Sequence, residues 1–179
     1  MKNGLPFVYS FPPVVSRNSK VLILGSMPGE VSLKAHQYYA YPHNAFWRIM
    51  GELCSAGPSL PYQERLAALD NAGIALWDSL RACTRPGSLD SAIRDEEAND
   101  FASLFVSFPK ITHVFFNGAK SEAVFRRYVF PTLAAPKHIF VRLPSTSPAH
   151  AGMTFDKKVE RWRVVTEALS GLRDLTARK

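Results

Sequence analysis

The chain has 179 residues, and its 22 Lys and Arg against 15 Asp and Glu give a formal net charge of +7. A hydrophobic content of 46% with 12% aromatic residues can build a substantial core, which excludes a disordered chain and indicates a folded domain. No apolar run approaches the roughly 18 to 20 residues that span a bilayer, and prolines interrupt residues 1–15 before a signal-peptide core can form. We therefore expect no membrane contact and a cytoplasmic location.

Cysteine and histidine usage gives no metal or redox motif. The two cysteines, Cys54 and Cys83, lie outside any C-x-x-C pattern, and the five histidines are scattered without ligand spacing. We expect reduced thiols, no metal ion and no cofactor. We treat residues 1–179 as a single domain, with residues 1–19 as an N-terminal extension and residues 170–179 as a C-terminal tail.

The first half of the chain alternates strand and helix signals. The apolar run at 21–24 predicts a buried strand that enters a tight loop, G-S-M-P-G at 25–29. Asn44 is placed to cap a helix over 44–53, and a second helix is predicted over 62–71, where Gly73 stops it. Residues 73–77 then predict a second short strand.

The second half continues this alternation. Asn99 and Asp100 can cap a helix that ends before Pro109. Strands are predicted over 112–116 and 138–143, with a helix over 119–128 between them. A last helix is predicted over 155–169, because apolar residues recur there at three- and four-residue steps. These apolar residues are Phe155, Val159, Trp162, Val165 and Leu169.

Strands that alternate with helices indicate a parallel sheet covered on both faces. The expected fold class is an α/β three-layer sandwich, in which helices flank a short, mainly parallel four-stranded sheet. In such folds the loops at the carboxyl ends of the strands carry the functional site. Those loops begin at Gly25, Trp77, Asn117 and Pro144, so four separate parts of the chain are expected to build it.

Basic residues concentrate toward the C-terminus. Residues 111–179 hold 12 basic and 5 acidic side chains, whereas residues 61–110 hold 5 basic and 8 acidic ones. A basic surface attracts polyanions such as nucleic acid, although proteins of similar charge exist that bind none. Charge alone leaves the partner open.

Two segments are suited to hold a heterocycle. The glycines of loop 25–29 permit close approach, so its backbone N–H groups can face an anion or a carbonyl; the alternative is a simple tight turn. Residues 37–47 combine aromatic residues and histidine with Asn44, which suits a stacked base; the alternative is helix core and a helix cap.

Taken together, these motifs resemble the uracil-DNA glycosylase superfamily. G-S-M-P-G at 25–29, followed by Q-Y-Y-A-Y-P-H-N-A-F-W at 37–47, is most similar to the hypoxanthine-DNA (deoxyinosine) glycosylase family. L-P-S-T-S-P-A-H at 143–150 resembles the superfamily's loop that enters DNA, and residues 73–78 and 115–118 fall at its other two site loops. The resemblance implies that fold and hydrolysis of the N-glycosidic bond of a flipped, deaminated base, in base-excision repair and without a cofactor.

The resemblance also implies roles for individual residues. Asn44 and Asp78 are the expected catalytic residues: Asn44 orients water or bonds to the leaving base, and Asp78 orients water or a neighbouring residue. Asn117 is expected to contact the edge of the flipped base. The expected base-binding residues are Gly25, Ser26, Met27, Pro28, Tyr39 and Asn117. The expected DNA-binding residues are Ser145, Thr146, Ser147, Pro148, Ala149 and His150, with Lys157 and Lys158 shortly after them.

Met27 departs from the uracil and mismatch-specific relatives, which have Asp or Asn at this position. A thioether cannot take a proton from water, and the hypoxanthine family shares the substitution. The favoured substrate is therefore deoxyinosine in DNA, cleaved by a monomeric, monofunctional enzyme. The alternatives are a uracil- or mismatch-directed glycosylase of the same superfamily, a catalytically silent nucleic-acid-binding module, and a small-molecule nucleosidase.

Overall fold

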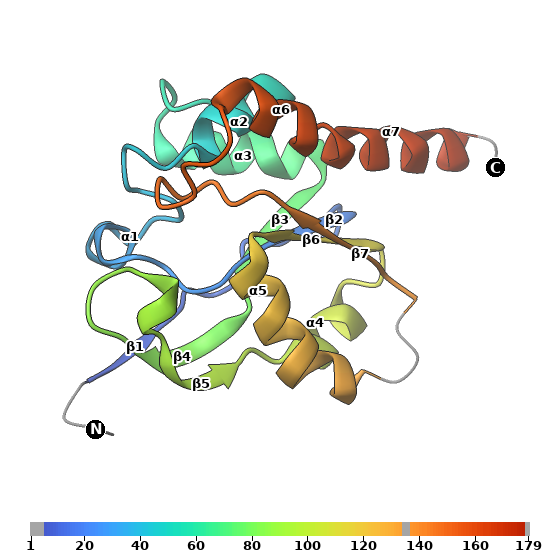
Figure 1. The fold of residues 1–179 in the computed structure, drawn as a ribbon. Coiled ribbons are helices and arrows are strands. Elements are labelled where there is room, and N and C mark those ends of the chain that lie inside the picture. Colours follow the sequence, from blue (N-terminus) through green and yellow to red (C-terminus); the bar gives the residue numbers. More distant parts are fainter. Residues whose placement is uncertain (1–5, 134–136, 178–179) are drawn as a thin grey trace.

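The computed structural model describes residues 6–133 and 137–177 and has a four-stranded parallel sheet at its centre (Figure 1). The strand order is β3-β2-β6-β7, and each predicted strand agrees with an observed one to within one residue at either end. The strands are β2 (Val21–Gly25), β3 (Ile74–Asp78), β6 (His113–Asn117) and β7 (Ile139–Leu143).

Alternate side chains of these strands enter two separate cores. Val21 and Ile23 pack with residues of α2, α3, α6 and α7 on one face, whereas Leu22 and Leu24 pack with α4 and the segment after α5 on the other. Figure 1 shows these two helical layers on opposite sides of the sheet, so the predicted three-layer sandwich is confirmed. The helices are α2 (Phe46–Cys54), α3 (Tyr62–Ala72), α4 (Phe101–Ser107), α5 (Ala119–Val124) with a π-helical continuation (Phe125–Val129), α6 (Phe155–Trp162) and α7 (Val164–Ala177).

Two helix boundaries differ from the prediction. Helix α2 begins at Phe46, and its N-cap position is Ala45. Asn44, one residue before that position, caps the helix because its Oδ1 accepts the Phe46 N–H at 3.0 Å. The helix predicted over 155–169 is interrupted at Arg163, and its second part, α7, continues to Ala177 through residues expected to form a tail. Asp100 caps α4 as predicted, since its side chain accepts the Ser103 N–H at 3.0 Å.

A second, three-stranded antiparallel sheet was not predicted. It has the order β1-β4-β5, and the single residue Ser79 separates β4 from β3. The N-terminal extension contributes strand β1 and a bridge between Val14 and Leu76, while residues 1–5 and 178–179 of the two expected terminal segments lie outside the described residues. The additional elements are β1 (Phe7–Tyr9), β4 (Leu80–Thr84), β5 (Arg94–Ala98), α1 (Glu30–Ala35) and two short 3-10 turns (Asp90–Ala92 and Phe130–Thr132). In the described part of the chain, every helix is too short or too polar to cross a membrane.

Candidate active site

The segments that follow the four parallel strands enclose one cavity of about 560 Å³ at the carboxyl edge of the sheet. The predicted convergence of four chain segments is therefore observed. All expected site residues line this cavity except Lys157 and Lys158. The lining residues that were expected are Gly25, Ser26, Met27, Pro28, Tyr39, Asn44, Asp78, Asn117, Ser145, Thr146, Ser147, Pro148, Ala149 and His150.

Gly25 permits the tightest approach in the cavity wall. Strand pairing sets Gly25 beside Asp78, and a Cβ on Gly25 would lie 2.5 Å from Asp78 Oδ1 and 3.2 Å from Tyr39 Oη. The first distance is well inside van der Waals contact, so only glycine leaves room for the carboxyl group. Gly25, at the end of β2, therefore allows the Asp78 carboxyl group and the Tyr39 hydroxyl group to lie close to the backbone.

Asp78 is a buried acid at the end of β3. It is 3% exposed, and its Oδ2 atom has no hydrogen-bond partner among the described residues. Burial, with a smaller contribution from the charge of Asp90, raises the pKa of Asp78 to about 8, against the opposing effect of Arg85. The carboxyl group is therefore mostly protonated at neutral pH.

Apolar packing of Met27 and a hydrogen bond from Arg85 hold the loop 25–29 in place. Met27 is buried and packs with Leu80, Ile93 and Val124. Arg85 is buried as well and donates its Nη2 hydrogen to the Pro28 carbonyl at 2.5 Å. Met27 thus anchors the loop by apolar packing. Its thioether cannot activate water.

Asn44 has one end fixed and the other available. Its Oδ1 caps α2, whereas its Nδ2 has no hydrogen-bond partner in the described part of the chain. The next residue, Ala45, donates its N–H to the Thr146 carbonyl at 3.0 Å, which ties the start of α2 to the loop 144–150. Both interpretations of Asn44 are therefore compatible, since the cap uses the oxygen and the amide hydrogens can serve a ligand.

Asn117 links three parts of the site. Its Nδ2 donates to Tyr39 Oη at 3.1 Å and to Thr146 Oγ1 at 2.8 Å, and its Oδ1 accepts the Thr146 N–H at 2.9 Å. Tyr39 in turn stacks on Phe46, with ring centroids 3.8 Å apart, and burial raises the pKa of its phenol. Both amide hydrogens of Asn117 are engaged, so the contact expected with the base edge is left to the second lone pair of Oδ1.

The sequence prediction missed one wall of the cavity, the segment 86–92 between β4 and β5. Asp90 Oδ1 accepts the Ser26 hydroxyl at 2.6 Å, and Ser88 Oγ accepts the Glu30 N–H at 2.9 Å, so this segment is joined to the loop 25–29 and to α1. Leu89 lines the cavity and is 60% exposed. The available signal was the Pro86-Gly87 turn pair, but the strands on either side lack the apolar alternation that identifies a hairpin.

Hydrogen bonds hold the backbone of the loop 144–150, whereas the side chains at its tip are exposed. Trp162 Nε1 donates to the Pro144 carbonyl at 3.0 Å, and Lys158 Nζ donates to the His150 carbonyl at 3.0 Å. Pro148, Ala149 and His150 are exposed, whereas Lys158 is buried. Because its ammonium group donates to the His150 carbonyl, Lys158 supports the loop in this structure.

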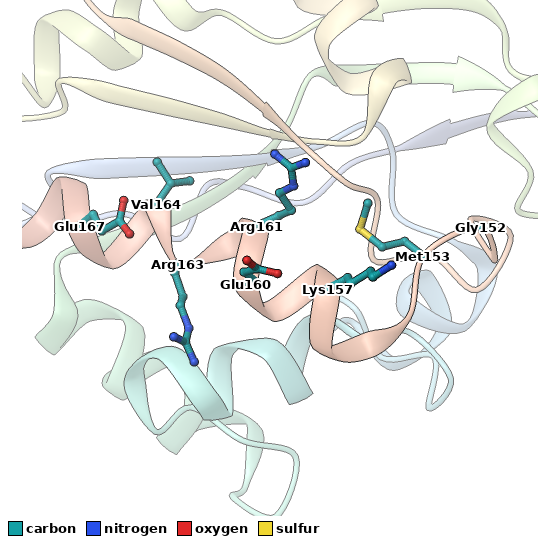
Figure 2. Close-up of a pocket in the computed structure, with 8 residues that line it drawn as sticks. All are labelled: Gly152, Met153, Lys157, Glu160, Arg161, Arg163, Val164 and Glu167. Carbon is teal, nitrogen blue, oxygen red and sulfur yellow. The ribbon is translucent and has the colours of Figure 1, made fainter.

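Lys157 lies on a different surface. Figure 2 shows it on α6 in a groove with Met153, Glu160 and Arg161, and this groove does not share a lining residue with the cavity. Lys157 is exposed and follows the loop tip by seven residues. Its charge is therefore exposed to solvent outside the cavity.

Comparison with known proteins identifies relatives over most of the chain. A family model described as the uracil DNA glycosylase superfamily matches residues 12–169. A hypoxanthine DNA glycosylase of Methanosarcina barkeri is 47% identical over 112 residues, which cover 62% of this chain and 71% of that protein. A hypoxanthine DNA glycosylase of Methanosarcina acetivorans is 36% identical over 159 residues, which cover 87% of this chain and 95% of that protein. A solution NMR structure from Methanosarcina acetivorans, provisionally described as a uracil DNA glycosylase, superposes with a TM-score of 0.78 at 33% identity and covers 92% of this chain and 99% of that one.

Proposed function

The chain belongs to the uracil DNA glycosylase superfamily, and from this premise we propose that it is a monofunctional DNA glycosylase of base-excision repair that releases hypoxanthine from deoxyinosine in DNA. The observation that carries the proposal is the convergence of all four site loops on one cavity whose lining offers amide and neutral acid groups, with Met27 at the base of the first loop. Relatives at 36% and 47% identity are named hypoxanthine DNA glycosylases, which supports the choice of base.

The reaction requires that the damaged nucleotide leave the duplex and enter the cavity. Unstacking costs a few kcal/mol, and a weakly paired base such as hypoxanthine lowers that cost. Pro148, Ala149 and His150 are exposed at the tip of the loop beside the cavity, where they are suited to fill the space that the flipped base leaves. Ser145 and Ser147 are suited to bind the flanking phosphates.

Recognition of hypoxanthine rests on its N1–H group. This group is a hydrogen-bond donor, whereas the same position of adenine is an acceptor. The free lone pair of Asn117 Oδ1 is an acceptor, and the amide hydrogens are turned toward Tyr39 and Thr146. An amide fixed in this orientation accepts hypoxanthine and rejects adenine, because adenine would leave two acceptors facing each other.

Bond cleavage depends on charge that develops in the transition state. The sugar gains oxocarbenium character while the base departs with negative charge, so donors that face the base lower the barrier. Asn44 Nδ2 has its hydrogens free for the water or the leaving base. An amide cannot act as a strong base, so Asn44 orients its partner and does not take a proton.

None of the described residues that line the cavity is a lysine, which supports hydrolysis without a Schiff-base lyase step. We also propose that the enzyme acts as a monomer. We further propose a cytoplasmic location, which the free thiols Cys54 and Cys83 support.

The test is single-turnover cleavage of matched oligonucleotides that contain deoxyinosine, deoxyuridine or a G·T mismatch, analysed with and without alkali. We expect the fastest release from deoxyinosine and strand breaks only after alkali. Faster uracil release would assign the chain to a uracil-directed activity, which a cavity with the same N–H acceptor also admits. Tight DNA binding without base release would indicate a silent binding module.

A further inference from the structure

We propose that Asp78 acts as a neutral carboxylic acid that donates its proton to the departing base. This inference rests on the proposed function and refines it, because it assigns Asp78 to the leaving group and not to the attacking water. The alternative, a carboxylate that activates water, makes the opposite prediction for the pH dependence of the rate.

The placement of Asp78 is the first argument. Its side chain lies at the end of β3 over Gly25, lines the cavity and is 3% exposed. Its Oδ2 atom is buried without a hydrogen-bond partner among the described residues. A buried polar atom without a partner is costly, and a ligand in the cavity that bonds to it relieves that cost.

The surroundings of Asp78 favour the neutral form. Tyr38 and Tyr39 face it from the segment 36–45, and burial keeps both phenols uncharged because it raises their pKa. Asp90 adds a negative charge from the segment 86–92, and Arg85 opposes it from the end of β4. No ion pair between Asp78 and Arg85 is found within the described ranges, where Arg85 instead donates to the Pro28 carbonyl.

The chemical step balances with water as the only co-reactant. The bond between C1′ of the sugar and N9 of hypoxanthine breaks, and its electron pair goes to the base. The Asp78 proton moves to a ring nitrogen of the base, so hypoxanthine leaves without a charge. The water oxygen bonds to C1′, and the proton that it loses returns through solvent to the Asp78 carboxylate, which restores the neutral acid.

The test is the pH dependence of single-turnover hypoxanthine release from pH 5.5 to 9.5 for the wild type, Asp78→Asn and Asp78→Ala. Since the pKa of Asp78 is about 8, the wild-type rate should fall about tenfold per pH unit above that value. Asn has the same size as Asp but its amide cannot transfer a proton, so Asp78→Asn should lose about 10²-fold at pH 6–7 and also lose the decline at high pH. Asp78→Ala should lose about 10²-fold or more.

Two further variants sharpen the test. Asp90→Asn removes the neighbouring negative charge, so the decline should move to lower pH. Glu64→Gln, an exposed carboxylate on α3 outside the cavity, should leave the profile unchanged. Thermal midpoints report whether each variant is folded.

A folded Asp78→Asn enzyme as fast as the wild type at pH 6–7, or a wild-type rate that rises with pH through 8, overturns the role of Asp78 and leaves the glycosylase intact. A wild type that releases no hypoxanthine at any pH overturns the proposed function itself.

Discussion

Asn117 and Thr146 hydrogen-bond to each other twice: the Thr146 N–H donates to Asn117 Oδ1 at 2.9 Å, and Asn117 Nδ2 donates to Thr146 Oγ1 at 2.8 Å. Thr146 is 1% exposed, and its carbonyl accepts the Ala45 N–H as well. The end of β6, the loop 144–150 and the start of α2 are therefore held together at one residue. The loop that is proposed to enter DNA thus shares its anchor with the amide that is proposed to contact the base.

Thr146→Val tests this anchor. Valine has nearly the same shape but no hydroxyl, so one hydrogen of Asn117 Nδ2 loses its acceptor inside the protein. We expect the free energy of unfolding to fall by about 1–3 kcal/mol. We expect the rate of base release to fall by about tenfold or more, because the amide reorients. Chemical denaturation and single-turnover kinetics measure the two effects. Thr132→Val, outside the cavity, is the matched control, and equal effects of both variants would contradict the coupling.

Gly25→Ala should damage the site directly. The added Cβ would meet Asp78 Oδ1 at 2.5 Å, so the carboxyl group or strand β2 must move. We expect the free energy of unfolding to fall by about 1–3 kcal/mol. We expect the rate of base release to fall by more than this loss of stability alone would cause. Gly171→Ala on α7 adds a Cβ with nothing within 4 Å and should stabilise the helix slightly. Thermal unfolding and cleavage of the deoxyinosine oligonucleotide give both numbers.

The parallel sheet was predictable because β2, β3 and β6 are largely buried and all four strands appear as short apolar runs. The antiparallel sheet was not, because β5 has the sequence R-D-E-E-A and is held by pairing with β4. Its Glu96 binds Lys120 of α5, and its Glu97 binds Arg81 of the neighbouring strand β4, pairs that no local pattern reveals. Helix α1 has only six residues and begins directly after the loop 25–29, so its periodicity was too short to detect.

The cavity lining was predictable for a different reason. Residues at the carboxyl ends of parallel strands must meet, so Gly25, Asp78 and Asn117 were placed together from chain order alone. Sequence could not show how they share hydrogen bonds. The two Asn117 amide hydrogens bind partners that lie 78 and 29 residues away in the chain. Lys158 binds a backbone carbonyl that lies 8 residues away.

The contribution of Asp78 to the stability of the protein should fall as pH rises from 3.8 to about 8. Over this range Asp78 holds its proton in the folded protein, whereas the same group in the unfolded chain has its ordinary pKa of 3.8 and loses it. The folded state therefore binds more protons, and stability declines with pH. Asp78→Asn should abolish this part of the decline and be more stable than the wild type at pH 9. Urea denaturation at pH 5, 7 and 9 measures the difference, and parallel curves for the two proteins would disprove it.

Asn44 carries two roles that a pair of variants can separate. Asn44→Ala removes the cap and the amide, so stability should fall by about 0.5–2 kcal/mol and base release by roughly 10²-fold. Asn44→Asp keeps an oxygen for the Phe46 N–H but removes the free hydrogens, so stability should be retained and activity lost to the same extent. A fully active Asn44→Asp enzyme would reduce Asn44 to a helix cap.

The adjacent lysines of α6 should differ in how they affect DNA binding. Lys157 is exposed in the groove of Figure 2, so Lys157→Met should lower the slope of log affinity against log salt by about 1 without changing stability.

Lys158 is buried, burial lowers its pKa, and its Nζ donates to the His150 carbonyl. Lys158→Met should therefore leave the salt slope unchanged, cost about 0.5–1.5 kcal/mol in stability and weaken cleavage of duplex more than of single-stranded DNA. Salt titrations of binding to a deoxyinosine duplex separate the two lysines, and a reduced slope for Lys158→Met would mean that this side chain leaves its buried position to reach the phosphates.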